Sequence, residues 1–276
     1  LLNAMTPNEA LLHVVRAFDD PSVPHSEGSV DPQRDIEIVD IELLLSDLGI
    51  VEKRLERLRN DMARGLSKDK RAANESEFAL MQRLQAQLSA ERPLRDLDLT
   101  PAELKALRNF GLLTLKPLLV VVNVGDHRPE DGLARFAFYQ HKRTVLVPLQ
   151  GRLEMELAQM PPEEAAEWLP EYGIEEPGLN RLIRVSYDLL GLQSFFTVGE
   201  DEVRAWTIPV GATAVEAAGV IHSDLAKGFI RAEVVSYDAL IAAGSLAAAA
   251  KNAALRLEGR DYVVKDGDIL NIRFNV

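Results

Sequence analysis

The sequence predicts a parallel α/β part followed by a smaller α+β part, and three observations predict this division. Up to residue 193, short aliphatic runs alternate with helical patterns, as in a parallel sheet with crossing helices. A long amphipathic stretch interrupts this alternation between residues 39 and 110. From residue 194 onward, short alternating strands surround an alanine-rich helix and an Asp-Gly turn.

The composition is that of an ordinary globular protein. The chain has 276 residues, 47% of them hydrophobic and 27% charged. It contains no cysteine, which excludes disulfides and cysteine-based metal sites and fits a cytoplasmic protein. No uncharged apolar run reaches the length of about 18 residues that a membrane span needs, so we expect no membrane partner. The net charge of −12 argues against nonspecific coating of nucleic acid, and sequence-specific DNA binding is not expected.

Three aliphatic runs predict the strands of the first part. Leu11–Phe18 is a short run rich in β-formers, and a loop of Asp, Pro, Ser and Gly follows it over Asp19–Pro32. Lys116–Val122 is continuously aliphatic after its first two residues, which is typical of a strand buried on both faces. Thr144–Leu149 is the third run, and a helix is expected after it.

The stretch between residues 39 and 110 predicts an antiparallel helical hairpin. Apolar residues recur there with steps of three and four, as in a coiled-coil seam: Ile41, Leu44, Leu48, Val51, Leu55, Leu58 and Met62. A second amphipathic run follows the break near Gly65 and contains Phe78, Met81, Leu84 and Leu88. The turn between the two helices carries four basic residues against one acid: Arg64, Lys68, Lys70 and Arg71 against Asp69. The cluster is either a solvated loop or a contact point for RNA phosphate, and the hairpin either projects as an arm or packs on its own domain.

The remaining elements follow from helix caps, breakers and alternation. Thr100-Pro101 predicts a helix start, with Thr100 as the N-cap and proline at the first helical position. Pro161–Leu192 is expected to be helical, with breaks at Gly173 and at Pro177-Gly178. The second part is expected to contain a hairpin of 195–198 with 203–208, helices over 214–220 and 237–254, and strands over 229–236, 255–257, 262–264 and 269–274. The Asp266-Gly267 turn is expected to join the last two strands.

The most suggestive polar pattern stands directly after the second aliphatic run. There the chain reads Asn123-Val124-Gly125-Asp126. An Asn side chain at this place can brace the loop and reach a purine base, and the Asp carboxylate can accept from the N–H groups of the base. Carboxyl ends of parallel strands are where open α/β sheets bind ligands. Asx residues after strands are also common as simple turn formers.

Other catalytic patterns are weak. The sequence contains no G-x-x-x-x-G-K-[ST] loop, so nothing within these residues cradles a triphosphate. None of the five histidines is spaced for zinc binding. His25, in the Pro/Ser/Gly loop, is the histidine free enough to suggest general-base work, or it is an ordinary exposed loop histidine.

Taken together, these features resemble the YchF/Obg-like ATPases. The most specific stretches are Val30–Glu42, Glu175–Ile183, Phe195–Gly211, Ala218–Glu233 and Leu257–Val276. The resemblance implies a P-loop G domain of the translation-factor class with an inserted coiled-coil hairpin, followed by a β-grasp (ubiquitin-like) TGS domain. It divides the chain into residues 1–38 and 111–193 as G-domain parts, 39–110 as the hairpin and 194–276 as the TGS domain.

The resemblance also implies functional residues and partners. The base-binding residues would be Asn123, Val124 and Asp126, with Gln150 and Gly151 from a second loop. Val124 keeps the family's loss of the usual lysine, which goes with ATP in preference to GTP, whereas Asp126 replaces the family's glutamate and leaves GTP open. His25 matches the loop histidine suggested to act in catalysis. The implied partners are ATP/ADP with Mg²⁺ and the ribosome, with the cluster of Arg64, Lys68, Lys70 and Arg71 as a contact.

One expected part of the family pattern is absent from this sequence. The P-loop, switch I and switch II of the family, which hold the phosphates and Mg²⁺, have no counterpart in the 276 residues. We therefore expect the G domain to be incomplete here, with hydrolysis depending on the segment that holds the phosphates. The alternative is a non-catalytic module that binds the ribosome, RNA or a protein through the hairpin and the TGS domain.

Overall fold

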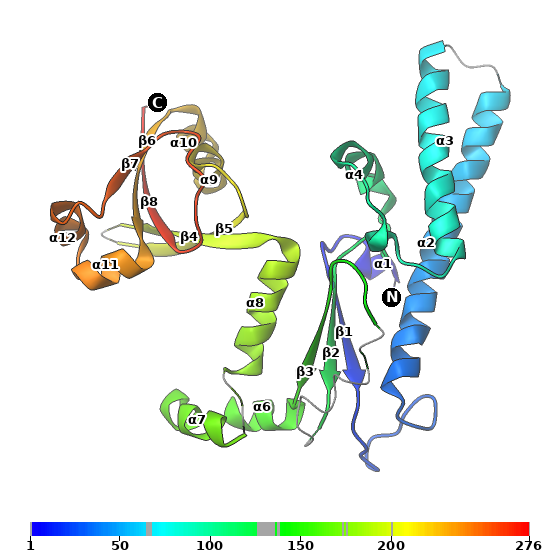
Figure 1. The fold of residues 1–276 in the computed structure, drawn as a ribbon, viewed down its shortest axis with the longest axis horizontal. Coiled ribbons are helices and arrows are strands. Elements are labelled where there is room, and N and C mark those ends of the chain that lie inside the picture. Colours follow the sequence, from blue (N-terminus) through cyan, green and yellow to red (C-terminus); the bar gives the residue numbers. More distant parts are fainter. Residues whose placement is uncertain are drawn as a thin grey trace. The chain divides into compact units, whose positions relative to one another are not determined.

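The computed structural model of the protein describes residues 2–64, 68–125, 136, 139–172, 174, 176–199 and 201–275. The chain divides into two compact units, Leu1–Leu189 and Leu190–Val276 (Figure 1). Each unit has its own buried apolar clusters. Within the described part, no helix is long and apolar enough to cross a membrane.

A three-stranded parallel sheet in the order β1-β2-β3 forms the centre of the first unit. β1 (Leu11–Arg16), β2 (Leu118–Asn123) and β3 (Thr144–Leu149) pair in register over their whole length. The five aliphatic residues of the central strand β2 are each at most 2% exposed, because helices cover both of its faces. The three predicted strands are therefore confirmed, although the first ends at Arg16 instead of Phe18, and the second spans Leu118–Asn123 instead of Lys116–Val122.

Helices cover the two faces of this sheet. α2 (Pro32–Ala63) packs on one face through Ile36 and Leu43, and α8 (Gly178–Leu190) packs on the other through Leu182, Val185 and Leu189. Between β3 and α8 lie α6 (Gly151–Leu157), α7 (Pro162–Trp168) and the 3₁₀ turn η4 (Leu169–Tyr172). A four-residue helix, α1 (Leu2–Met5), precedes β1.

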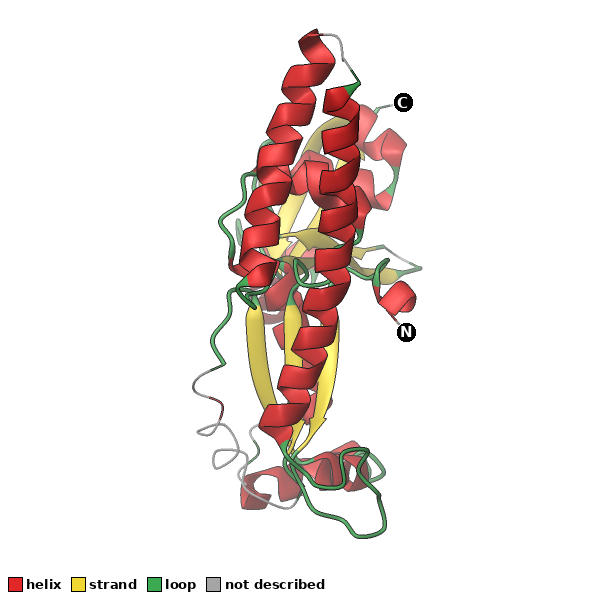
Figure 2. Cartoon of the chain, turned by 90° about the vertical axis from the view of Figure 1, so that its right-hand side faces the viewer, coloured by secondary structure: helices red, strands yellow, loops and turns green. Residues whose placement is uncertain are grey.

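α2 continues beyond the sheet and packs against α3 (Lys68–Ser89) as a helical hairpin (Figure 2). Asp31 caps the start of α2, and Pro32 occupies its first turn. The buried residues of the hairpin are Leu44, Val51, Leu55 and Leu58 from α2 and Leu80, Met81, Leu84 and Leu88 from α3. The buried seam therefore begins at Leu44, the second of the expected seam residues, and not at Ile41. Ile41 is 50% exposed, because at this level α2 turns a different side, carrying Ile36 and Leu43, toward the sheet.

A buried carboxylate fastens α2 to the chain that enters β2. Asp47 is 0% exposed, and it accepts hydrogen bonds from the backbone N–H groups of Leu113 and Thr114, both at 2.8 Å. The Thr114 hydroxyl donates a third bond at 2.6 Å. Burial raises the pKa of the Asp47 carboxyl, and these three donors act in the opposite direction. The contact therefore fixes the base of the hairpin against the sheet.

The segment between α3 and β2 contains η1 (Leu94–Asp96), α4 (Pro101–Leu107) and η2 (Arg108–Phe110). The predicted N-cap at Thr100 is confirmed, since its hydroxyl accepts from the backbone N–H of Glu103 and the Glu103 carboxylate accepts from the backbone N–H of Thr100.

The second unit is built on a five-stranded mixed sheet in the order β5-β4-β8-β6-β7. Its strands are β4 (Leu192–Val198), β5 (Val203–Pro209), β6 (Phe229–Ser236), β7 (Arg256–Glu258) and β8 (Asp268–Phe274). β4 and β8 pair parallel, and the other neighbours pair antiparallel. The helices are α9 (Ala214–Ile221), α10 (Ser223–Lys227), α11 (Tyr237–Ala243) and α12 (Leu246–Lys251).

Two expectations for this unit are wrong. Residues 262–264 are no strand and make a single isolated bridge, from Val263 to Thr213, while β8 pairs with β6 and β4. The Asp266-Gly267 turn exists, with Gly267 at a φ of 76°, but it leads out of an irregular segment. The expected helix over 237–254 is two helices, because Gly244 adopts a left-handed conformation and Ser245 caps a new start.

Candidate functional site

Three loops meet at the carboxyl edge of the parallel sheet. They follow β1 at Ala17, β2 at Val124 and β3 at Gln150. The backbone ties them together, since Ala17 N–H donates to the carbonyl of Asn123 at 2.8 Å and Val124 N–H donates to the carbonyl of Leu149 at 2.9 Å. This edge is the usual ligand position of an open parallel sheet.

Asn123 braces two of the three loops. Its Oδ1 accepts from the backbone N–H of Gly125 at 3.3 Å and from that of Gly151 at 3.1 Å. Because one oxygen takes both bonds, the side chain holds the loop after β2 against the first turn of α6. The expected bracing role of Asn123 is thus seen in the structure, and the Nδ2 group keeps its donor capacity for another partner or water.

Two glycines allow the loops to approach this closely. Gly125 has a φ of 66°, and a Cβ added there would lie 2.7 Å from the Cβ of Phe18 in the loop after β1. A Cβ added at Gly151 would lie 2.8 Å from Nδ2 of Asn123. A side chain at either position would therefore displace one of the loops.

The neighbouring candidate residues point away from solvent. Val124 is 2% exposed and belongs to the apolar cluster beneath α2, and Gln150 is 9% exposed. Gly151 begins α6, so its part in the site is played by its backbone. Asp126 lies outside the described residues.

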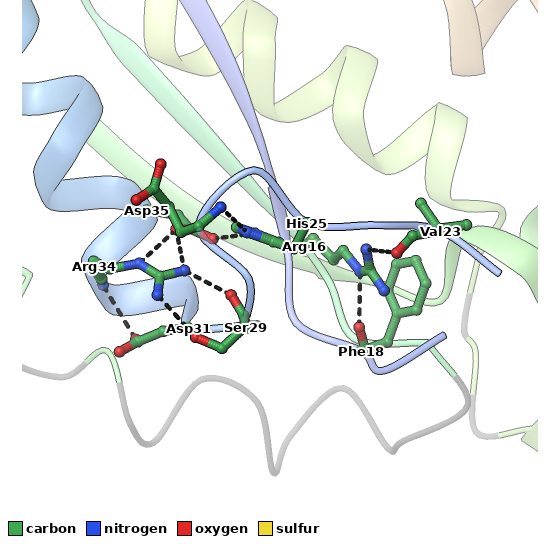
Figure 3. A network of polar contacts seen from close by, with 9 residues as sticks. Arg16, Phe18, Val23, His25, Ser29, Asp31, Arg34 and Asp35 are labelled. Atoms are coloured by element: carbon green, nitrogen blue, oxygen red, sulfur yellow. Dashed lines mark hydrogen bonds and ion pairs between the residues drawn. The ribbon is translucent and has the colours of Figure 1, made fainter. Parts of the chain in front are cut away.

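His25 lies in the loop between β1 and α2, but it is not the free side chain that the sequence suggested (Figure 3). Its Nε2 is 2.9 Å from Oδ2 of Asp35, and its Nδ1 accepts from the backbone N–H of Glu27 at 3.2 Å. The side chain is 14% exposed. Asp35 stands in the first turn of α2, so the histidine is held by the helix that follows its loop.

Two arginines organise the same loop. Arg16, at the end of β1, donates to the carbonyls of Phe18, Asp20 and Val23, and its guanidinium lies 4.8 Å from the centroid of the Phe18 ring (Figure 3). Arg34 donates to Oδ1 of Asp35 through Nε and Nη2, at 3.1 and 2.9 Å. These residues did not stand out in the sequence. Two signals were available in the sequence: Arg16 stands at the end of an aliphatic run, and Arg34-Asp35 follows the proline that starts a helix.

Glu154, in the first turn of α6, holds the start of another helix. Both of its carboxylate oxygens accept from the backbone N–H of Gly178 at 2.8 Å. This contact ties α6 to the start of α8, beside Leu149 at the end of β3.

The basic cluster lies at the far end of the hairpin. Arg64 is the C-cap residue that follows α2, and Lys70 and Arg71 are exposed near the start of α3. Arg71 forms an ion pair with Glu75 at 3.0 Å, so part of its charge is already balanced. The side chain of Lys68 lies outside the described residues.

In the described ranges, no three His, Asp or Glu side chains gather in a way that could hold a metal ion.

The first unit thus has the architecture of the open α/β proteins. In that class, ligands bind at loops that follow the carboxyl ends of the parallel strands. A family model described as "Protein of unknown function (DUF933)", named YchF-GTPase_C, matches residues 192–275. The ribosome-binding ATPase YchF of Bacillus subtilis is 42% identical over 274 residues, which cover 97% of this chain and 74% of that protein.

Two further comparisons agree. Obg-like ATPase 1 of Caenorhabditis elegans is 35% identical over 281 residues, covering 99% of this chain and 70% of its own. The solved structure of the Schizosaccharomyces pombe YchF GTPase superposes with a TM-score of 0.86 at 32% identity, covering 99% of this chain and 74% of that one. The chain belongs to the YchF/Obg-like ATPase family.

Proposed function

We propose that this protein is a ribosome-associated ATPase that acts in translation or its regulation under stress, in the cytoplasm. The observation that carries the proposal is the 42% identity over nearly the whole chain to a relative named ribosome-binding ATPase. The braced loops at the carboxyl edge of the sheet support it, since they give a nucleotide base a place to bind.

The base would bind between the loops after β2 and β3. In this proposal Asn123 holds both loops and offers Nδ2 to the purine, Val124 fills the core in place of a lysine, and Asp126 accepts from the base. Gln150 and Gly151 shape the second loop, and the backbone N–H groups near Gly151 complete the pocket. ATP is the preferred nucleotide, with GTP possible because of Asp126.

Hydrolysis would use His25 as the general base. Water attacks the γ-phosphorus, the bond to the β–γ bridging oxygen breaks, ADP leaves, and the proton of the water passes to an imidazole nitrogen. Mg²⁺ would accompany the nucleotide and neutralise phosphate charge. The reaction also needs a phosphate-binding loop of the G-x-x-x-x-G-K-[ST] kind, which these 276 residues do not contain.

The helical hairpin and the second unit would supply the contacts to the ribosome. We assign residues 1–38 and 111–193 to the G domain, 39–110 to the coiled-coil arm and 194–276 to a β-grasp TGS domain. The basic cluster at the end of the arm, Arg64, Lys68, Lys70 and Arg71, is the proposed RNA contact.

Ribosome binding can be tested on the 276-residue chain by co-sedimentation. Reversing the four basic residues to glutamate should weaken binding at least tenfold and lower its salt dependence, because phosphate contacts release counterions. A matched control reverses Lys53 and Arg57, two exposed cations on the shaft of α2, and should leave binding unchanged. Equal sedimentation of the wild-type chain and the cluster variant would reject the assigned contact.

ATP hydrolysis is tested on the protein expressed from its native gene. It should release phosphate from ATP faster in the presence of ribosomes, and His25→Ala should lower that rate by about 10²-fold or more. The second candidate is a binding module without turnover, which would use the exposed basic residues at the end of the hairpin. Ribosome binding without any ATP hydrolysis by the full protein would establish that reading in its place.

A further inference from the structure

The ring of His25 has no lone pair available to water in this structure. A backbone N–H can only donate, so the contact from Glu27 at 3.2 Å makes Nδ1 an acceptor. The ring proton of the neutral histidine is then on Nε2, which donates to Oδ2 of Asp35 at 2.9 Å. Both nitrogens are therefore engaged, and the side chains of His25 and Asp35 are only 14% and 17% exposed.

Asp35 is itself held in place from the other side. Arg34 donates two hydrogen bonds to Oδ1 of Asp35, leaving Oδ2 for the histidine. The same guanidinium donates to the carbonyl of Ser29 at 2.7 Å and to the Ser29 hydroxyl at 3.0 Å. Arg34 thus ties the end of the His25 loop to the first turn of α2, and Figure 3 shows the three side chains in one network.

A general base needs a free nitrogen within hydrogen-bond reach of the proton that it takes. We propose that Asp35, fixed by Arg34, is a latch that stores His25 in a conformation unable to act on water. Hydrolysis then requires the loop to open, with loss of the His25–Asp35 and His25–Glu27 contacts. The inference rests on the proposed function only for the catalytic role of His25. The holding of His25 by Asp35 can be tested separately.

A carboxylate beside a histidine can have two roles, and they predict opposite changes in the reaction rate when the carboxylate is removed. In catalytic Asp-His pairs, the carboxylate orients the ring for proton transfer, and its removal lowers the rate. Here the second nitrogen accepts from a backbone N–H, so removal of Asp35 leaves the ring held by the Glu27 contact alone and lets the loop open more easily. A positioning residue that stores the base must raise basal turnover when it is lost, whereas an orienting residue must lower it.

The first test measures accessibility of the ring in the 276-residue chain. Diethyl pyrocarbonate modifies accessible neutral imidazole, and mass spectrometry of peptides gives a rate for each histidine. His222, whose side chain is 65% exposed, serves as the reference. Its Nδ1 also accepts from a backbone N–H, that of Asp224 at 3.2 Å, so the two rings differ in burial and in the contact of Nε2 with a carboxylate. His141, which has its own carboxylate partner in Asp96 at 2.8 Å, serves as a control within the same unit.

Wild-type His25 should react at least tenfold more slowly than His222. Asp35→Ala should raise its rate by about tenfold, the factor expected for loss of a charge-assisted hydrogen bond, and leave His141 unchanged. Asp35→Asn keeps one acceptor oxygen and should give an intermediate rate. The matched control is Asp31→Ala, which removes the cap of the same helix turn without touching His25, and should change its rate less than twofold.

Two outcomes of this test overturn the latch. One is a wild-type His25 that reacts as fast as His222, and the other is an Asp35→Ala chain whose His25 rate stays unchanged while His141 reports an intact fold. An independent signature comes from nitrogen NMR of the ring. Wild-type His25 should show the tautomer protonated at Nε2, and Asp35→Ala should shift the population toward the other tautomer.

The second test is ATP turnover by the full protein without ribosomes. Asp35→Ala should raise basal phosphate release several-fold, and a fall would show that Asp35 orients the base, contrary to the latch. If the wild-type protein hydrolyses no ATP under any condition, the proposed function fails. The modification rates would still decide whether Asp35 holds His25.

Discussion

Gly125 stands where the loops after β1 and β2 touch. Its φ of 66° and the 2.7 Å separation between an added Cβ and the Cβ of Phe18 leave no room for a side chain. We expect Gly125→Ala to lower the free energy of unfolding by about 1–3 kcal/mol, measured by urea denaturation. Gly49→Ala is the control, because that glycine lies inside α2 with nothing within 4 Å of an added Cβ, and it should stabilise the protein by about 0.5–1 kcal/mol. Equal stability of Gly125→Ala and the wild type would contradict the packing argument.

Asp126 is the residue that we expect to influence the choice between ATP and GTP. A glutamate at this position reaches one methylene further, and the family resemblance associates it with ATP. We expect Asp126→Glu to raise the ratio of ATP to GTP affinity in the full protein, measured by competition between the two nucleotides. Asp126→Asn, which keeps the length but removes the charge, should weaken both. An unchanged ratio in the glutamate variant would remove Asp126 from base selection.

Contacts between residues that are close in sequence were predicted far better than contacts between separate loops. Asn123 was identified because it follows a strand, but its bond to Gly151, 28 residues away, depends on β2 and β3 being neighbours. His25 was placed correctly in a loop, and its partner Asp35 was missed because no local pattern links a loop histidine to the next helix turn. Burial of both side chains follows from tertiary packing, which composition does not report.

At the scale of elements, prediction succeeded where one physical pattern dominates. Continuous aliphatic runs gave all three parallel strands, with Thr144–Leu149 correct at both ends. The Asp266-Gly267 turn was also real, but its strand partner was wrong, because β8 pairs with β6 across more than thirty residues of sequence. Alanine-rich composition likewise hid the break at Gly244 that separates α11 from α12.

The buried Asp47 carboxylate stabilises the junction between the hairpin and the sheet, and its contribution to the free energy of unfolding can be measured. Removing this buried carboxylate leaves three donors on Leu113 and Thr114 without their acceptor. We expect Asp47→Ala to lower the free energy of unfolding by about 3 kcal/mol, measured by urea denaturation. Glu42→Ala removes an exposed acid from the same helix and should stay within about 0.5 kcal/mol of the wild type. A small effect at Asp47 would mean that water reaches these donors and that the junction is loose.

At the scale of the first unit, α2 joins the two proposed functional regions. Its first turn holds Arg34 and Asp35, and Arg64 follows its last residue, so a single helix of 32 residues, about 48 Å long, runs from the latch to the basic cluster. Asp47 fixes this helix to the sheet between the two ends. A ribosome that engages the cluster therefore acts on the same rigid element that holds His25.

This arrangement predicts coupling between ribosome binding and the latch. Added ribosomes should raise the modification rate of His25 several-fold in the wild-type chain, leave His141 unchanged, and have no effect on His25 when the basic cluster is reversed to glutamate. Ribosome binding and loop opening are linked, so Asp35→Ala, which favours the open loop, should tighten ribosome binding by at most the factor by which ribosomes open the latch. Co-sedimentation gives that factor independently of any chemistry at the nucleotide. If ribosomes bind the wild-type and Asp35→Ala chains equally while His25 becomes reactive only in the variant, the latch and the arm are separate devices.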